Sequence, residues 1–202
     1  MQNLIFPDLK IVQNSDLEKA TRTLLLAFEH DPCLRYLLNN SYPEREAKFI
    51  HNFVLKTGLE KGKVYTTSEN VEGVAVWLPP ESIKLSWFDF IKFGGLKIPL
   101  KHILKMNTYD LHAKKIHNSV VKSPHWYLLS LSVQPIQQGK SLGTKMLKPM
   151  LEFFDMTKQS CYLETHNQKN IPFYEKNGFK IMSITKLPNS DTNHYSMLRH
   201  PK

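Results

Sequence analysis

The segment from residue 126 to residue 179 constrains the fold more than any other part of this chain. Residues 125–133 are mainly aromatic and aliphatic, which predicts a β-strand. A loop with glycines at positions 139 and 143 follows. After it, apolar residues recur at the spacing of one helical face: Gly143, Met146, Leu147, Met150, Leu151 and Phe154. This order of strand, loop and helix leaves unpaired backbone N–H groups at the positive end of the helix, where phosphate binds favourably.

The loop sequence separates two known kinds of phosphate site. Gly139-Lys140-Ser141 resembles the end of a Walker A loop, but that pattern requires a glycine where Gln134 stands. The loop is more similar to V-x-P-x-x-Q-G-x-(G/A/S)-x-G, the pyrophosphate-binding loop of the GCN5-related N-acetyltransferase (GNAT) family. Ser141 stands where that family more often has glycine. The matching residues are Val133, Pro135, Gln138, Gly139, Ser141 and Gly143.

A second motif lies beyond the predicted helix. Residues 163–179 have the pattern L-E-T-x-N-x-x-N-x-P-x-Y-E-x-x-G-F. This pattern resembles the second half of the acetyl-CoA site in the same family, and it is most similar to the branch of puromycin acetyltransferase-like proteins. Two motifs in the expected order make the resemblance specific over roughly residues 126–198, whereas the N-terminal half resembles the family only weakly.

The resemblance implies an α/β fold in one domain spanning residues 1–202. We expect a GNAT-like mixed, mostly antiparallel sheet flanked by helices, with a central parallel strand pair that splays apart. Ser15 and Glu18 have the spacing of a capping box and predict the start of a first helix. Sequence patterns predict the remaining elements: a strand at 9–12, a helix at 44–61, a hairpin of 63–68 with 73–78, a helical insertion at about 83–121, a short strand at 161–165, and last strands at 179–184 and 194–198.

The same resemblance implies acetyl-CoA as cosubstrate and assigns residues to it. Backbone donors of the loop would hold the pyrophosphate: Gln138, Gly139, Lys140, Ser141, Leu142, Gly143 and Thr144. The edge of the central strand would pair with the pantetheine arm through Leu131, Ser132 and Val133. Asn167 or Asn170 would bond that arm as well, and their spacing from Tyr174 does not choose between them.

Two residues of the second motif are candidates for acid–base chemistry. Tyr174 is the predicted general acid, because a phenol with a pKa of about 10 stays protonated at neutral pH and donates to a leaving thiolate. Glu164, at the end of its strand, is a candidate general base, and Glu29, His30 and Asp31 are alternatives. Pro149 should kink the coenzyme helix but leave its phosphate end intact.

Composition limits the other function classes. The net charge of +9 and the pI near 9.4 suit either a solvated lysine-rich surface or attraction of anionic coenzyme A. We find no nucleic-acid motif, no H-E-x-x-H and no apolar run long enough to span a membrane. These features predict no metal, no nucleic-acid partner and no stable membrane insertion. Cys33 and Cys161 are isolated, which is typical of reduced thiols in a cytoplasmic protein.

The basic insertion at 83–121 is open to two interpretations. It carries Trp87, Phe88, Phe90 and Phe93 among its lysines, so it is either a helical lid over the acceptor pocket or a segment that lies on a membrane surface.

The chain as a whole is predicted to be a monomeric or homodimeric N-acetyltransferase. It would transfer an acetyl group to the primary amine of a small, unidentified acceptor by direct attack in a ternary complex. The alternatives are a non-catalytic acyl-CoA-binding regulatory module and a protein or peptide N-acetyltransferase.

Overall fold

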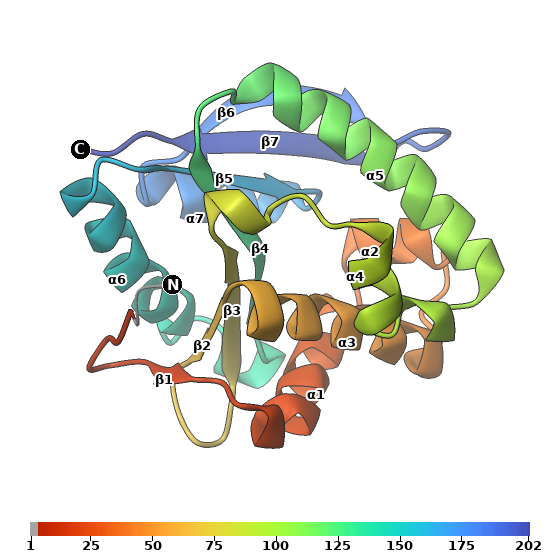
Figure 1. The fold of residues 1–202 in the computed structure, drawn as a ribbon, viewed down its shortest axis with the longest axis horizontal. Helices are drawn as coiled ribbons and strands as arrows, with labels where there is room; N and C mark the ends of the chain where they lie inside the picture. The colour runs from red at the N-terminus through yellow and green to blue at the C-terminus, as the bar shows by residue number, and fades with distance from the viewer. Residues whose placement is uncertain (1–3) are drawn as a thin grey trace.

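The computed structural model describes residues 4–202, so residues 1–3 of the predicted domain lie outside the described part. Within it, seven strands form one mixed sheet in the order β1-β2-β3-β4-β5-β7-β6 (Figure 1). Only β4 and β5 are parallel neighbours among these strands, as predicted. The strands are β1 (Lys10–Ile11), β2 (Lys63–Thr66), β3 (Gly73–Leu78), β4 (His125–Val133), β5 (Ser160–Thr165), β6 (Lys180–Lys186) and β7 (Asn193–Arg199).

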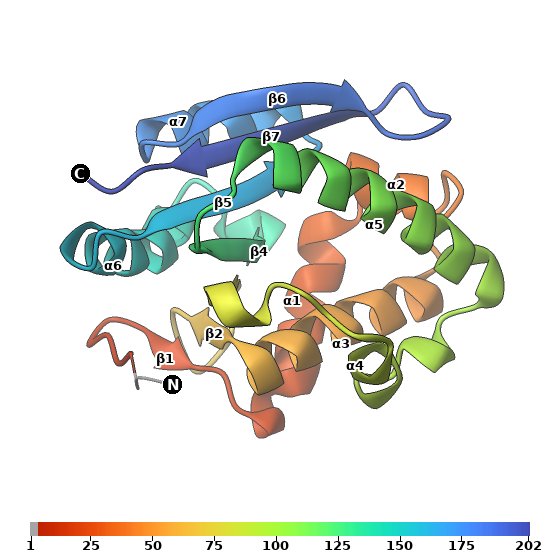
Figure 2. The ribbon, with the colours of Figure 1, turned by 45° about the horizontal axis from the view of Figure 1, so that its top comes forward.

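Helices cover both faces of the sheet. Alternate residues of β3 show the two layers, since Val74 and Val76 pack with α1 and α3 whereas Ala75 and Trp77 pack with α6. Figure 2 shows α1, α3 and α4 beside the β1–β3 half of the sheet and α5 along the β5–β7 half. The α-helices are α1 (Leu17–Phe28), α2 (Pro32–Leu37), α3 (Glu44–Lys61), α4 (Trp87–Lys92), α5 (Leu100–Val120), α6 (Leu142–Met156) and α7 (Ile171–Lys176).

The start of the first helix differs from the prediction. Residues 14–16 form a 3-10 turn, and α1 begins at Leu17, so the predicted cap at Ser15 is wrong. The carboxylate of Asp16 accepts the backbone N–H of Gln13 at 3.0 Å. Asp16 therefore stabilises this helix start in place of the Ser15–Glu18 pair, because its charged side chain is the better acceptor for a free N–H.

The insertion at 83–121 folds as the glycines and prolines predict. Gly94, with φ of 89°, ends α4, and Pro99 caps the start of α5. Helix α5 then packs against β6 and β7 and reaches the centre of the molecule through Tyr109. This part of the insertion therefore packs over the sheet.

The central strand pair opens at a defined point. The parallel pairing of β4 with β5 ends at Leu128 and Leu163, while β4 continues to Val133. On the other side, Ser130 pairs with Val76 and Leu128 with Trp77, so Leu129 is an extra residue that forms a β-bulge. A bulge bends its strand and ends regular pairing, and such bulges are common beside active sites. The edge of β4 beyond the bulge is thus left without a strand partner on the β5 side.

Candidate active site

The loop between β4 and α6 presents a row of backbone donors. The N–H groups of residues 139–144 have no hydrogen-bond acceptor within the described chain, and α6 begins at Leu142 beside them. Gly139 and Ser141 both have positive φ, of 78° and 60°, which turns successive N–H groups toward one side. The amide of Gln138 donates to the Val133 carbonyl at 3.1 Å and ties the loop back to β4. The arrangement suits a diphosphate, and Pro149 lies far enough along α6 to leave this end unaffected.

Replacing Ser141 by glycine should stabilise the protein. A side chain in the left-handed region strains the backbone, and glycine relieves that strain while adding some disorder to the unfolded chain. We expect the free energy of unfolding of Ser141→Gly to rise by about 0.5–1 kcal/mol in denaturant titrations, with coenzyme binding retained. Ser123→Gly is the matched control, because Ser123 is exposed and lacks a positive φ, so it should lose stability instead.

A cavity of about 200 Å³ lies where β4 and β5 separate. Its walls come from the N-terminal helices, from β4 around the bulge, from the end of β5 and from α5 and α7. Two carboxylates line it, and no lysine or arginine is among its described lining residues. The residues that matter for chemistry are Asp31, Cys33, Tyr109, Tyr127, Glu164, His166, Asn170 and Tyr174.

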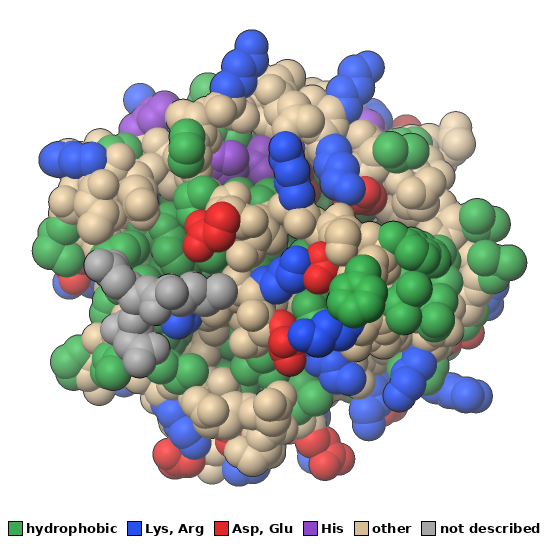
Figure 3. All heavy atoms as spheres, viewed as in Figure 1, with side chains coloured by type: hydrophobic (Ala, Val, Ile, Leu, Met, Phe, Trp, Pro, Cys, Tyr) green, Lys and Arg blue, Asp and Glu red, His purple; other side chains and the backbone are tan. Residues whose placement is uncertain are grey.

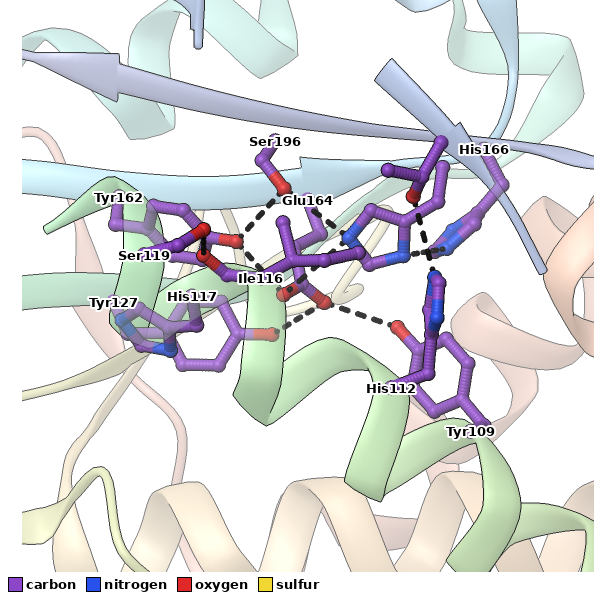
Figure 4. A network of polar contacts seen from close by, with 12 residues as sticks. Tyr109, His112, Ile116, His117, Ser119, Tyr127, Tyr162, Glu164, His166 and Ser196 are labelled. Carbon is purple, nitrogen blue, oxygen red and sulfur yellow. Dashed lines mark hydrogen bonds and ion pairs between the residues drawn. The ribbon is translucent and has the colours of Figure 1, made fainter. Parts of the chain in front are cut away.

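Three tyrosines surround the carboxylate of Glu164 (Figure 4). The hydroxyl of Tyr109 donates to Glu164 Oε2 at 3.0 Å, that of Tyr127 to the same oxygen at 3.4 Å, and that of Tyr162 to Oε1 at 2.9 Å. Burial raises the pKa of Glu164 above the usual range of a carboxyl, and the three phenol donors oppose that rise. The residue is therefore a carboxylate of increased basicity, held in one orientation.

Histidines complete the surroundings of Glu164 without adding charge. His194 Nε2 lies 3.6 Å from Glu164 Oε1, and His194 Nδ1 lies 3.2 Å from His166 Nε2. Burial lowers the pKa of His194 to about 4 and that of His166 to about 3, so both are neutral at pH 7. Burial likewise raises the pKa of Asp31. Glu164 and Asp31 are thus the two acidic groups of the cavity, with no lysine or arginine of the described chain lining it.

Tyr174 lies in the same cavity as Glu164, on α7. Its ring is buried between Phe173 and Phe179, at centroid distances of 5.2 and 5.8 Å. Its hydroxyl has no hydrogen-bond partner among residues 4–202, and it is not one of the fully enclosed unpaired atoms. Burial raises the pKa of the phenol, so it carries its proton at neutral pH.

The structure brings only part of the predicted set to this cavity. Leu131, Glu164, Asn170 and Tyr174 line it, as do Phe28 and the alternative base Asp31. The two other alternative bases, Glu29 and His30, are exposed and do not line it. Ser132, Val133 and Asn167 do not line the cavity. Neither do the predicted pyrophosphate-binding residues of the loop: Gln138, Gly139, Lys140, Ser141, Leu142, Gly143 and Thr144.

The two candidate asparagines have different environments. Asn167 accepts the backbone N–H of Lys169 at 3.1 Å and caps the short turn that precedes α7. Asn170 lines the cavity, and its amide donates only a long contact of 3.4 Å to Thr165. Asn170 is thus better placed to meet a ligand at the cavity. Within residues 4–202 no cluster of three or more His, Cys, Asp or Glu side chains is arranged to hold a metal ion.

Sequence reasoning missed the residues that hold Glu164. Tyr127 and Glu164 lie on neighbouring parallel strands, so the predicted strand pair contained a signal for their contact. Tyr109 is 55 residues away on α5, and no pattern in the sequence indicates that it reaches the same carboxylate.

Comparison with known proteins agrees with this geometry. Residues 108–181 match the acetyltransferase (GNAT) domain family. An uncharacterized N-acetyltransferase of Schizosaccharomyces pombe is 24% identical over 187 residues, covering 84% of this chain and 73% of that protein.

Solved structures share the fold at low sequence identity. A histone acetyltransferase HPA2-related protein of Corynebacterium glutamicum has a TM-score of 0.63 at 19% identity, with 98% of each chain covered. Arylalkylamine N-acetyltransferase 2 of Aedes aegypti has a TM-score of 0.61 at 14% identity, covering 96% of this chain and 98% of that one. An agmatine N-acetyltransferase has a TM-score of 0.59 at 17% identity, covering 96% and 99%. The domain match over residues 108–181, the N-acetyltransferase relative and the shared fold together support an N-acetyltransferase.

Proposed function

We propose that this protein transfers the acetyl group of acetyl-CoA to the primary amine of a small cationic acceptor, by direct attack in a ternary complex. The observation that carries the proposal is the cavity shared by Glu164 and Tyr174, one a basic carboxylate and the other a protonated phenol. Asp31 adds a second carboxylate, and the absence of lysine and arginine from the described lining favours a positively charged ligand.

The residues around the β4–α6 loop fit the coenzyme. The free N–H groups of 139–144 would hold its pyrophosphate, and a Cβ at Gly139 would project into open space, where a ligand has room to approach. The unpaired edge of β4 at Leu131, Ser132 and Val133 would bond the pantetheine arm, with Asn170 beside it. When bound, acetyl-CoA supplies the acetyl group as a thioester.

The chain's own residues then move protons and orient the acceptor. Glu164 takes the proton of the acceptor ammonium, directly or through water, and so frees the nucleophilic amine. Tyr174 donates its proton to the sulfur as the carbon–sulfur bond breaks, and its phenolate then takes the remaining extra proton of the newly acetylated nitrogen. A backbone N–H at the bulged part of β4 would polarise the acetyl carbonyl, and one such donor contributes about 2.7–4 kcal/mol to transition-state stabilisation.

The size of the cavity limits the acceptor. At about 200 Å³ it is smaller than the cavities that hold drug-sized ligands. Solved structures with the same fold include enzymes named for agmatine and for arylalkylamines, both small amines. Together these observations favour a small amine over a protein or peptide acceptor. The likeness of residues 163–179 to the puromycin acetyltransferase-like branch stays a prediction.

A panel of acceptors tests the proposal. Release of the coenzyme thiol from acetyl-CoA would be followed with agmatine, a polyamine, an arylalkylamine, an aminoglycoside and a peptide with a free N-terminus. We expect turnover with small cationic amines and none with the peptide. Acetyl-CoA binding in calorimetry without thiol release on any acceptor would instead support the non-catalytic module, and turnover of the peptide alone would overturn the small-acceptor assignment.

A charge introduced at Gly139 tests the phosphate loop by itself. Gly139→Asp places a carboxylate against the expected pyrophosphate, so the dissociation constant of acetyl-CoA should rise about 10- to 100-fold, as loss of bonds to a charged group would predict. Gly94→Asp is the matched control, since Gly94 also has positive φ and has open space where a side chain would begin. Calorimetry should show Gly94→Asp binding acetyl-CoA like the unchanged protein, and equal weakening in both variants would contradict the loop assignment.

A further inference from the structure

A group of large apolar side chains on the insertion faces solvent. Trp87 is 65% exposed and Phe88 is 71% exposed, and both lie on α4. We call the whole group the apolar patch, and Figure 3 shows apolar and lysine side chains gathered together over α4 and the start of α5. The apolar patch consists of Trp87, Phe88, Ile91, Leu96, Leu100 and Leu104.

The exposure of the apolar patch is fixed by the inward face of α4. Phe90 and Phe93 pack against Phe53, with ring centroids 5.5 and 6.4 Å apart. Asp89 accepts a hydrogen bond from Lys61 at 2.6 Å. Because these contacts set the rotation of the helix, Trp87 and Phe88 cannot turn inward without breaking them. Large exposed apolar patches usually mark a surface that binds another protein, a membrane or a ligand.

Positive charge surrounds the apolar patch. Between residues 82 and 109 the only acid is Asp89, which is buried and paired with Lys61. Lys92 and Lys101 form ion pairs with acids of α3, at 2.7 Å to Glu60 and 3.6 Å to Glu46. Lys84 and Lys97 are exposed and have no ion-pair partner among the described residues. The sequence of this segment gives five lysines in all: Lys84, Lys92, Lys97, Lys101 and Lys105.

We propose that the apolar patch and its lysines dock the protein on the surface of an anionic lipid bilayer. Leucine, phenylalanine and tryptophan side chains favour the boundary between headgroups and acyl chains, and lysines near them attract anionic headgroups. No helix among residues 4–202 is long and apolar enough to cross a membrane. The docking is therefore peripheral, with α4 and the first turns of α5 lying against the surface.

Charge and chemistry favour a lipid surface over two other occupants. A second copy of the chain would set this positively charged surface, with its unpaired Lys84 and Lys97, against the same surface of its partner, which is repulsive. A nucleic acid could use the lysines and the rings of Trp87 and Phe88, but the other four members of the apolar patch are aliphatic and offer no flat ring for base stacking.

Vesicle binding of the full chain tests the proposal. The protein would be sedimented with vesicles of phosphatidylcholine alone and of phosphatidylcholine mixed with phosphatidylserine, and its tryptophan emission recorded. Trp77 and Trp126 are buried, so a blue shift on the mixed vesicles reports Trp87 entering the interface. We expect binding only to the mixed vesicles, weakened by salt, and about fivefold weaker for each of Lys84→Ala and Lys97→Ala.

Matched variants separate the apolar patch from general surface charge. Trp87→Ser with Phe88→Ser should abolish vesicle binding and leave the protein folded, with a small fall in the thermal midpoint, because both side chains are exposed and Trp87 only stacks on Phe90. Met156→Ser and Lys180→Ala, which change exposed residues outside the insertion, should bind like the original protein. Absence of binding to the mixed vesicles, or binding that survives the double serine variant, overturns the proposal. So does self-association in analytical ultracentrifugation that the double variant removes, since it would assign the patch to a second copy.

Discussion

Tyr174→Phe should lower the turnover number about 10²- to 10³-fold and leave the affinity for acetyl-CoA unchanged, since a positioned general acid contributes about this much. The variant removes one hydroxyl, and that hydroxyl has no hydrogen-bond partner among residues 4–202. The ring keeps its contacts with Phe173 and Phe179. Steady-state kinetics with the best acceptor of the panel, together with calorimetry of acetyl-CoA binding, would measure the two quantities separately.

Tyr65→Phe is the control for this prediction. Its hydroxyl donates to the Leu4 carbonyl at 2.8 Å, and Tyr65 does not line the cavity. This variant should lose about 1 kcal/mol of stability from the missing hydrogen bond and keep its turnover number. The assignment of Tyr174 as the general acid fails if Tyr174→Phe turns over as fast as the unchanged protein, or if both variants lose turnover to the same extent.

Local pattern in the sequence predicted most of the fold, because each element is specified by its own residues. The helix at 44–61, the strand at 125–133 and the apolar face of α6 follow directly from spacing. The β-bulge at Leu129 has no such local signal, since it depends on how β3 and β4 align across the sheet. The error at Ser15 has a related cause: two capping arrangements overlap there, and the carboxylate of Asp16 forms the bond that the structure contains.

The candidate site likewise has residues that a local motif predicts and residues that only the folded chain brings together. Glu164 and Tyr174 belong to one continuous motif, so the sequence named both, and both line the cavity. The environment that sets the basicity of Glu164 is assembled from α5, β4 and β5, and its members have no common motif. A carboxylate in a strand could therefore be named as a candidate from the sequence, whereas its burial and its tyrosine donors required the fold.

Glu164→Gln should lower kcat/KM about 10²-fold at neutral pH and remove the acidic limb of the pH–rate profile. Burial raises the pKa of Glu164, and the base is active only when ionised. The rate of the unchanged protein should therefore rise with pH through a midpoint above the usual carboxyl range. Glutamine cannot take the proton at any pH, so the variant should show no such rise.

Stability should respond to the same substitution in the opposite direction. A carboxyl whose pKa is higher in the folded state than in the unfolded chain contributes stability when protonated, and that contribution is lost as pH rises through the folded-state pKa. Burial of Glu164 thus costs stability at pH 7, where the carboxyl of the unfolded chain is ionised, and Glu164→Gln should raise the free energy of unfolding there. A variant that is more stable but slower would mark Glu164 as a residue kept for chemistry.

Tyr109→Phe distinguishes a catalytic role of Glu164 from a purely structural one, because only the catalytic role predicts a shift in the acidic limb of the pH–rate profile. The hydroxyl of Tyr109 donates to the carboxylate and lowers its pKa, so removing it should move the acidic limb of the profile to higher pH. The plateau rate above that limb should change much less than in Glu164→Gln. If Glu164 only supported the fold, Tyr109→Phe would alter stability and leave the midpoint of the limb where it was, and one of the alternative carboxylates, Asp31 above all, would become the base.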